Sequence, residues 1–102
     1  MNKRKEYVDY QEILLEELKN PEFAVGYLNE SLKDKDQRVF LLALKNVFQA
    51  QGGDMTSLAK EINISRQNIY RILSTRGNPR WENLSSLLDK MGLEIQLSLK
   101  RK

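Results

Sequence analysis

Apolar residues recur along most of this chain at the spacing of helices that bury one face. Between residues 10 and 91 they return at steps of three and four, with polar residues between them. Residues that start or stop helices divide this region into segments. These positions are Asn20 with Pro21, Asp36, Gly52 with Gly53, Gly77 with Asn78 and Pro79, and Gly92. The pattern predicts an all-α fold for this part of the chain.

The longest predicted helix begins after Asp36 and ends at the glycines at 52–53. Leu41 and Leu42 widen its apolar stripe, so we expect a central helix that is buried on two sides. The other apolar positions of this helix are Val39, Phe40, Ala43, Leu44, Val47 and Phe48. Gly26, in the preceding helix, weakens that helix by about 1 kcal/mol relative to alanine and indicates close packing against a neighbour.

The last residues follow a period of two instead. In "LEIQLSLK" (93–100) apolar and polar residues alternate, which predicts a short β-strand. The apolar face consists of Leu93, Ile95, Leu97 and Leu99. Because no second strand is predicted, the edge of this strand needs a partner. We expect the same strand of a second copy, in an antiparallel homodimer, and the alternative is packing on the chain's own helices.

Charge is distributed unevenly along the chain. Residues 1–36 carry 6 Lys/Arg and 9 Asp/Glu, whereas residues 37–102 carry 11 and 5. The acidic part favours a basic partner and the basic part a polyanion, although both can equally be ordinary solvated surfaces. We interpret residues 1–35 as an N-terminal helical arm. Residues 36–102 are interpreted as a five-helix-like domain that ends in the strand.

The 102 residues fit one domain with a modest core, and the chain contains no cysteine and no histidine. Disulfides and thiolate metal sites are excluded, and the commonest general base and metal ligand are missing. We therefore expect no cofactor and no metal, and an enzyme is disfavoured. There is no apolar run of about 20 residues and no signal peptide, so we expect a cytoplasmic protein without a membrane partner.

The stretch "LAKEINISRQNIYRIL" (58–73) predicts a helix-turn-helix. Ala59 is small where the second helix crosses the first, Asn63 tolerates the turn conformation, and Ser65 can cap the second helix. The residues assigned to packing between the helices are Leu58, Ala59, Ile62, Ile64, Ile69 and Ile72. The second helix then presents a face without acidic residues, which suits approach to a phosphate surface.

The outward residues of this pair are of the types that bind DNA. Arginine can fork onto guanine, and glutamine or asparagine onto adenine, so the base-reading candidates are Arg66, Gln67, Asn68 and Arg71. The candidates for contacts to the DNA backbone are Thr56, Ser57, Ser65, Arg76, Asn78 and Arg80. Tyr70 can instead pack against neighbouring residues. We interpret Trp81 as a core or dimer anchor rather than a residue that stacks on bases.

With these residues in place, the sequence resembles the addiction-module antidote proteins, HigA-like antitoxins with a Cro/C1-type helix-turn-helix. The pieces that carry the resemblance are "YLNESL" (27–32), "FLLAL" (40–44), "LAKEINISRQNIYRILSTRGNP" (58–79) and "MGLEI" (91–95). The resemblance runs from about residue 27 to residue 95. It implies an antitoxin that binds and silences a RelE/ParE-like toxin and represses the shared operon by binding a palindromic operator as a dimer.

Carried onto this chain, the resemblance implies operator readers at Ser65, Arg66, Gln67, Asn68 and Arg71. It also directs attention to the "YLNESL" helix and the arm before it as the toxin-binding part. The candidates there are Phe23, Tyr27, Leu28 and Glu30. The acidic arm, in this reading, covers a cationic RNA-binding surface of the toxin.

Two other classes of function stay open. The first is a stand-alone Cro/C1-like repressor without a toxin partner, for which the neighbouring reading frame is the simplest discriminator. The second is a protein-interaction adaptor whose second helix meets a protein. A steep dependence of duplex-DNA binding on salt argues against the adaptor.

Overall fold

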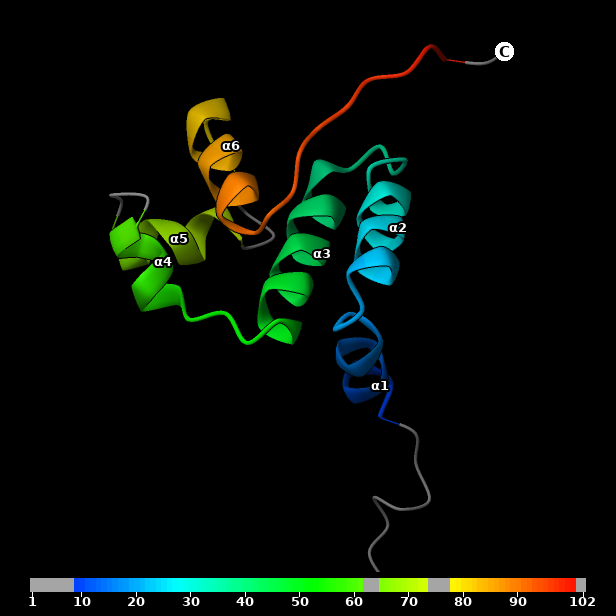
Figure 1. Cartoon of the computed structure of the whole chain (residues 1–102). Coiled ribbons are helices and arrows are strands. Elements are labelled where there is room, and N and C mark those ends of the chain that lie inside the picture. The colour runs from blue at the N-terminus through cyan, green and yellow to red at the C-terminus, as the bar shows by residue number, and fades with distance from the viewer. Residues whose placement is uncertain (1–8, 62–64, 74–77, 101–102) are drawn as a thin grey trace, which may run out of the picture.

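The computed structural model describes residues 9–61, 65–73 and 78–100, and this part of the chain is helical (Figure 1). The helices are α1 (Tyr10–Glu17), α2 (Pro21–Ser31), α3 (Gln37–Ala50), α4 (Met55–Glu61), α5 (Arg66–Ile72) and α6 (Trp81–Lys90). The predicted helical class is therefore confirmed. None of these helices is long and apolar enough to cross a membrane.

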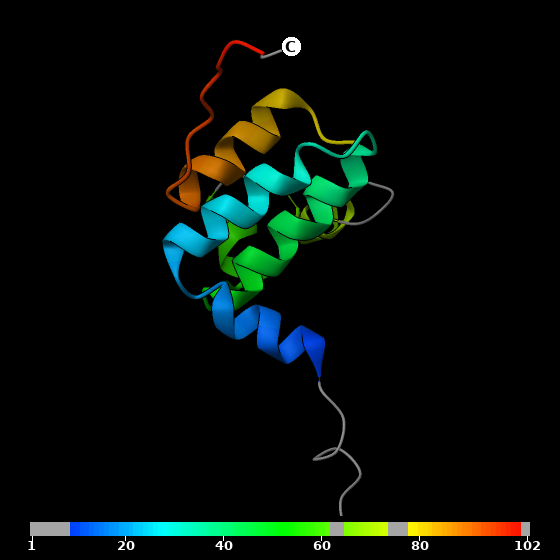
Figure 2. The same ribbon diagram turned by 90° about the vertical axis from the view of Figure 1, so that its right-hand side faces the viewer.

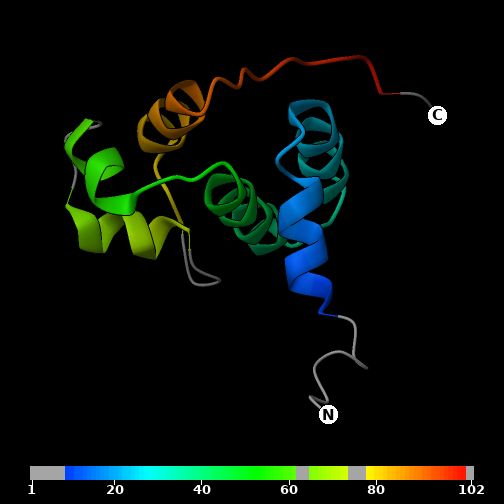
Figure 3. The same cartoon turned by 60° about the horizontal axis from the view of Figure 1, so that its bottom comes forward.

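Helix α3 lies in the middle of the molecule. Helices α1 and α2 lie along one side of it, and α4, α5 and α6 lie on the other side (Figure 1 and Figure 3). Leu44 and Val47 of α3 are almost completely buried, as expected for a central helix. The expectation of burial on two sides is wrong for part of α3, because Val39 and Leu42 are 39% and 44% exposed.

Local capping explains where α2 and α3 begin. The Asn20 side chain accepts hydrogen bonds from the Glu22 and Phe23 backbone N–H groups, and Pro21 occupies the first helical turn. Asp36 accepts from the Arg38 backbone N–H at 3.0 Å. Both predicted helix starts are confirmed, because caps of this kind depend only on residues close in sequence.

One hydrophobic core joins the N-terminal helices α1 and α2 to the helices α4, α5 and α6. Leu18 and Leu28 pack in the same cluster as Leu44 of α3, Ile69 of α5 and Leu87 of α6. Leu18, which follows α1 directly, is 0% exposed. The helices between residues 10 and 31 are therefore packed on the rest of the molecule.

A short polar bridge also connects the first three helices. Asn46 of α3, which is 8% exposed, accepts a hydrogen bond from the Gln11 side chain of α1 at 3.2 Å. Its own amide group donates to the Tyr27 hydroxyl of α2 at 3.0 Å. The buried amide thus has partners on both sides, as a buried polar group requires.

The structure overturns the expectation for Gly26. A Cβ atom built at this position meets no atom within 4 Å, and the residue is exposed. No neighbouring element approaches it closely, so packing is not the reason for a glycine in this helix.

The predicted C-terminal strand is not formed in the single chain. Residues 93–100 are neither helix nor strand, and they leave the helical body as an extended segment (Figure 1 and Figure 2). A strand requires a hydrogen-bonded neighbour, and the described residues supply none. Leu93 packs against the core, and its backbone N–H donates to the Leu88 carbonyl at 2.9 Å. Packing within its own chain therefore already occupies one of the four predicted dimer residues.

Candidate nucleic-acid interface

Helices α4 and α5 pack against each other through buried apolar side chains. Leu58 and Ala59 of α4 are 4% and 5% exposed, and Ile69 and Ile72 of α5 are 0% and 6% exposed. The small side chain of Ala59 allows a close approach of the two helices. These four packing assignments are confirmed, whereas Ile62, Asn63 and Ile64 lie outside the described residues.

The opposite face of α5 is open to solvent. Ser65 caps the helix, because its hydroxyl accepts a hydrogen bond from the Asn68 backbone N–H at 3.1 Å. Gln67, Asn68 and Arg71 are all exposed, as a base-reading role requires. Arg66 is the first residue of α5, but its side chain is not among the described ones, and Arg76 lies outside the described residues.

The start of α4 is less suited to a phosphate than its sequence suggests. The Thr56 backbone N–H donates to the Asp54 carboxylate at 3.1 Å, and the Ser57 hydroxyl donates to the same carboxylate at 2.9 Å. The donors that were expected to hold a phosphate are therefore already bound to a negative group. The exposed face of α5 is the stronger part of this surface.

The start of α6 adds exposed polar residues to the same half of the molecule. Asn78 and Arg80 are exposed, and the Arg80 guanidinium lies 3.5 Å from the Glu82 carboxylate. That pair is solvent-exposed on both sides, so it constrains Arg80 only weakly. Trp81 is 65% exposed, so this residue is not a core anchor, and its alternative role as a dimer anchor stays a prediction. It is the first residue of α6, about two turns before the buried Leu88.

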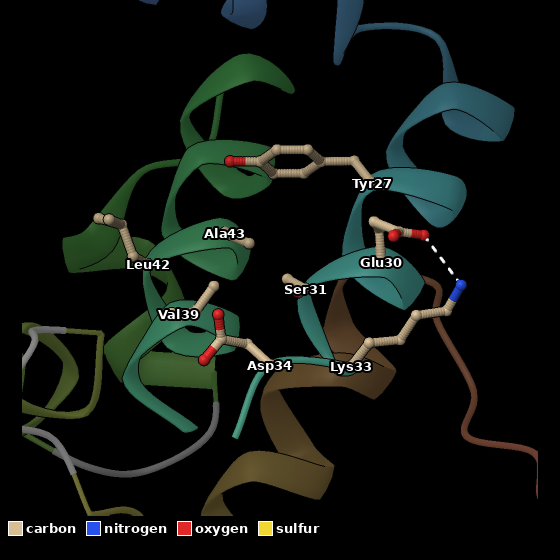
Figure 4. Close-up of a pocket in the computed structure, with 8 residues that line it drawn as sticks. All are labelled: Tyr27, Glu30, Ser31, Lys33, Asp34, Val39, Leu42 and Ala43. Carbon is tan, nitrogen blue, oxygen red and sulfur yellow. Dashed lines mark ion pairs between the residues drawn. The ribbon is translucent and has the colours of Figure 1, made fainter. Parts of the chain in front are cut away.

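A second candidate surface lies between α2 and α3. An open pocket of about 500 Å³ lies there. Figure 4 shows Tyr27, Glu30 and Ser31 on one side of it and Val39 and Leu42 on the other. The Tyr27 ring is held in place by the Asn46 amide described above. Glu30 forms an exposed ion pair with Lys33 at 3.1 Å. The pocket thus combines an apolar wall with charged groups at its rim.

Not every predicted toxin-binding residue can reach a partner. Leu28 is 5% exposed and belongs to the core, so its assignment to a binding surface is wrong. It faces inward because it lies one turn after Ala24 on the buried side of α2. Phe23 is 40% exposed and Glu30 is exposed, so both remain accessible.

Sequence reasoning missed Val39 and Leu42 as surface residues. Their apolar spacing assigned them to the core, yet both line the open pocket. The width of the apolar stripe on α3 could have indicated their exposure. A helix that packs against neighbours on only part of its circumference cannot bury every position of a wide stripe.

The loop that enters α3 is fixed by acidic side chains. Asp34 accepts a hydrogen bond from the Asp36 backbone N–H at 2.8 Å. A hydrogen bond from the Arg38 side chain, together with one from the Arg38 backbone N–H, lowers the pKa of Asp36 from 3.8 to about 2. The same pairing raises the pKa of Arg38. Asp36 is therefore held in its charged form by Arg38, while the acidic residue that lines the pocket in this loop is Asp34.

Among residues 9–61, 65–73 and 78–100, no group of three or more His, Cys, Asp or Glu side chains is placed to hold a metal ion. The side chains present at the two surfaces carry amide, guanidinium, carboxylate and apolar groups. These features define a helical protein with the packed pair α4 and α5 on one side of α3 and the acidic helices α1 and α2 on the other.

The comparisons with known proteins identify the family. A family model described as "Probable addiction module antidote protein" matches residues 8–99. An "Uncharacterized protein" of Haemophilus influenzae is 31% identical over 75 residues, which cover 74% of this chain and 75% of that protein. No solved structure matches the chain. The chain therefore belongs to the family of probable addiction module antidote proteins, which implies an antitoxin with a toxin as its partner.

Proposed function

We propose that this chain is the antitoxin of a type II toxin–antitoxin module. It binds and neutralises a RelE/ParE-like toxin, and as a homodimer it represses its own operon by binding a palindromic operator. The family supports the antitoxin role. The observation that carries the DNA-binding role is α5, whose Ile69 and Ile72 are buried while Gln67, Asn68 and Arg71 are exposed.

The geometry of α5 suits recognition of bases in the major groove. Burial of one face fixes the rotation of the helix, so the polar side chains of the other face project together. Glutamine and asparagine can each form two hydrogen bonds with adenine, and arginine can do so with guanine. In this proposal Arg80 contacts the DNA backbone and positions the helix without reading the sequence.

The pocket between α2 and α3 is the proposed toxin contact. Residues 9–36 carry 8 Asp/Glu and 3 Lys/Arg, so this side of the molecule attracts a basic protein. Val39 and Leu42 supply exposed apolar area at the same place. Neutralisation follows by occlusion, because acidic and apolar groups cover the cationic surface with which the toxin meets RNA.

Two variants of the full chain test both activities, and each is the control for the other. Gln67→Ala should weaken binding to the cognate operator by about 1–3 kcal/mol and relax base preference, with toxin binding unchanged. Leu42→Asp should weaken binding to the protein from the adjacent reading frame, with operator binding unchanged. Fluorescence anisotropy with operator DNA and calorimetric titration with that protein measure the two affinities.

Deleting residues 1–33 is a poor test of the toxin contact, because it removes Leu18, Ala24 and Leu28 from the core. The point variants avoid this problem, since Gln67 and Leu42 are exposed. If operator binding is specific but the adjacent protein does not bind, the chain is a stand-alone Cro/C1-like repressor. Unchanged base preference in Gln67→Ala contradicts the proposed orientation of α5.

A further inference from the structure

The C-terminal segment exposes a row of large apolar side chains. Ile95, Leu97 and Leu99 are 50%, 95% and 96% exposed, and the segment runs away from the helices in Figure 1 and Figure 2. Such a row on a protein surface marks an interaction site. The backbone of residues 94–100 is also an unpaired edge, which is available to another strand.

The side chains of this segment already alternate as they do in a strand. The Gln96 amide donates a hydrogen bond to the Glu94 carboxylate at 2.9 Å, so these two side chains lie on the same side. Glu94 and Gln96 therefore lie on one side of the segment, and the period-two pattern of the sequence predicts Ser98 and Lys100 on that side and the apolar residues on the other. Among the described residues, Lys100 has no ion-pair partner.

We infer that residues 94–100 of two copies pair as an antiparallel ribbon with Leu97 opposite Leu97 of the second copy. In this register Ile95 faces Leu99, Gln96 faces Ser98, and Glu94 faces Lys100. Apolar residues meet apolar residues, and by two-fold symmetry the Glu94–Lys100 pair occurs twice. The inference rests on the homodimer of the proposed function and gives it a specific interface.

Other registers are less complementary. A shift of one residue places apolar and polar side chains directly opposite each other, on the same face of the ribbon. A pairing centred on Gln96 sets Glu94 against Ser98 and Lys100 against Gly92. Only the pairing centred on Leu97 brings the two opposite charges of this segment together. A second copy of this segment is therefore complementary to the first in both charge and apolar face, and it is the occupant that we propose.

Helix α2 supplies a surface for the apolar face of the ribbon. An open groove of about 610 Å³ lies between the segment and α2. Its α2 wall includes Val25 and Leu32, which are 43% and 56% exposed. A two-stranded ribbon by itself is marginally stable in water, and packing against a helix removes that limitation.

Single cysteine variants test the register, because the natural chain contains no cysteine. Under mild oxidation Leu97→Cys should form a disulfide-linked dimer. Ile95→Cys and Leu99→Cys should not do so alone, because each residue lies about 13 Å along the strands from its own copy. A mixture of these two variants should cross-link, because residues 95 and 99 face each other. The three side chains lie outside the core, so folding of the variants should be unaffected.

Charge reversal tests the Glu94–Lys100 pair. Glu94→Lys should raise the dimer dissociation constant about 2- to 30-fold, because two attractive pairs become repulsive. Lys100→Glu should act in the same way. The double variant Glu94→Lys/Lys100→Glu should restore the wild-type constant, since opposite charges again face each other. Sedimentation equilibrium measures all four proteins.

The inference is overturned if the wild type sediments as a monomer up to its highest soluble concentration. It is also overturned if Ile95→Cys or Leu99→Cys cross-links alone as well as Leu97→Cys does, or if the double variant stays weakened. Toxin and operator binding distinguish these results from failure of the proposed function. If the chain binds toxin and operator but Leu97→Cys does not cross-link, the ribbon is overturned and the proposed function stands. If Leu97→Cys cross-links but the chain binds neither toxin nor operator, the proposed function is overturned and the ribbon stands.

Discussion

Gly26 lies in the middle of α2 and faces open solvent. Glycine there lowers helix stability without a compensating contact, because a Cβ atom at this position meets nothing within 4 Å. Gly26→Ala should therefore stabilise the folded chain by about 1 kcal/mol. Urea denaturation followed by circular dichroism measures the change. A lower free energy of unfolding for Gly26→Ala contradicts the conclusion that this position has room for a Cβ atom and gains nothing from glycine.

Asp36 links stability to pH. Its pKa in the folded chain, about 2, lies below the ordinary value of 3.8, so the folded state favours the charged form. The stabilisation is fully present above about pH 4 and is lost as the pH falls towards 2. Asp36→Asn retains a side-chain oxygen for the cap but removes the charge that pairs with Arg38.

The measurement is urea denaturation of both proteins at a series of pH values. Wild type should be more stable than Asp36→Asn at neutral pH, and the difference should shrink as the pH is lowered from about 4 to 2. The other carboxyl groups titrate in both proteins, so they cancel in the comparison. A difference that is constant across this range contradicts the role of the Asp36 charge.

At the scale of elements, the bridge through Asn46 holds α1 and α2 to α3. Asn46→Ala removes both hydrogen bonds and leaves the Tyr27 hydroxyl without its donor. We expect a loss of about 1–3 kcal/mol in the free energy of unfolding and faster amide exchange in α1. Gln11→Ala, which removes only the exposed partner, is the matched control and should cost less. Equal effects of the two variants contradict a bridge centred on Asn46.

The sequence was sufficient for elements whose causes are local. Asn20, Asp36 and Ser65 cap helices through backbone groups only two or three residues away. The inward face of α5 was also predictable, because Ile69 and Ile72 share one side of a short helix. These features depend on neighbouring residues in the chain and need no knowledge of the fold.

Features that depend on distant neighbours could not be predicted in the same way. Val39 and Leu42 have the spacing of core residues, but no described helix covers them. Trp81 is apolar and large, yet it lies at the exposed start of α6. Residues 93–100 alternate like a strand, but a strand forms only beside a hydrogen-bonded neighbour, and the described residues of a single chain do not supply one.

At the scale of the whole molecule, the shared core predicts cooperative unfolding. Leu18 and Leu28 pack with Leu44 and Ile69, so the front helices cannot unfold without exposing the core of the helix pair. Calorimetry should show one two-state transition, with an enthalpy of about 70 kcal/mol near 60 °C for a chain of 102 residues. Two separate transitions contradict a single core and favour an independent arm over residues 1–35.

The positions of the acidic and basic helices on opposite sides of α3 have a consequence for how the protein approaches DNA. Residues 9–36 carry 8 Asp/Glu and 3 Lys/Arg, whereas residues 55–90 carry 3 and 6. The charges of these two ranges therefore contribute a dipole component that points across α3, between the two groups of helices in Figure 1. In the proposed function, the field of the DNA exerts a torque on this dipole that turns α5 towards the duplex before contact and turns α1 and α2 away from it. Added salt shortens the range of that torque, so orientation before contact is strongest at low ionic strength.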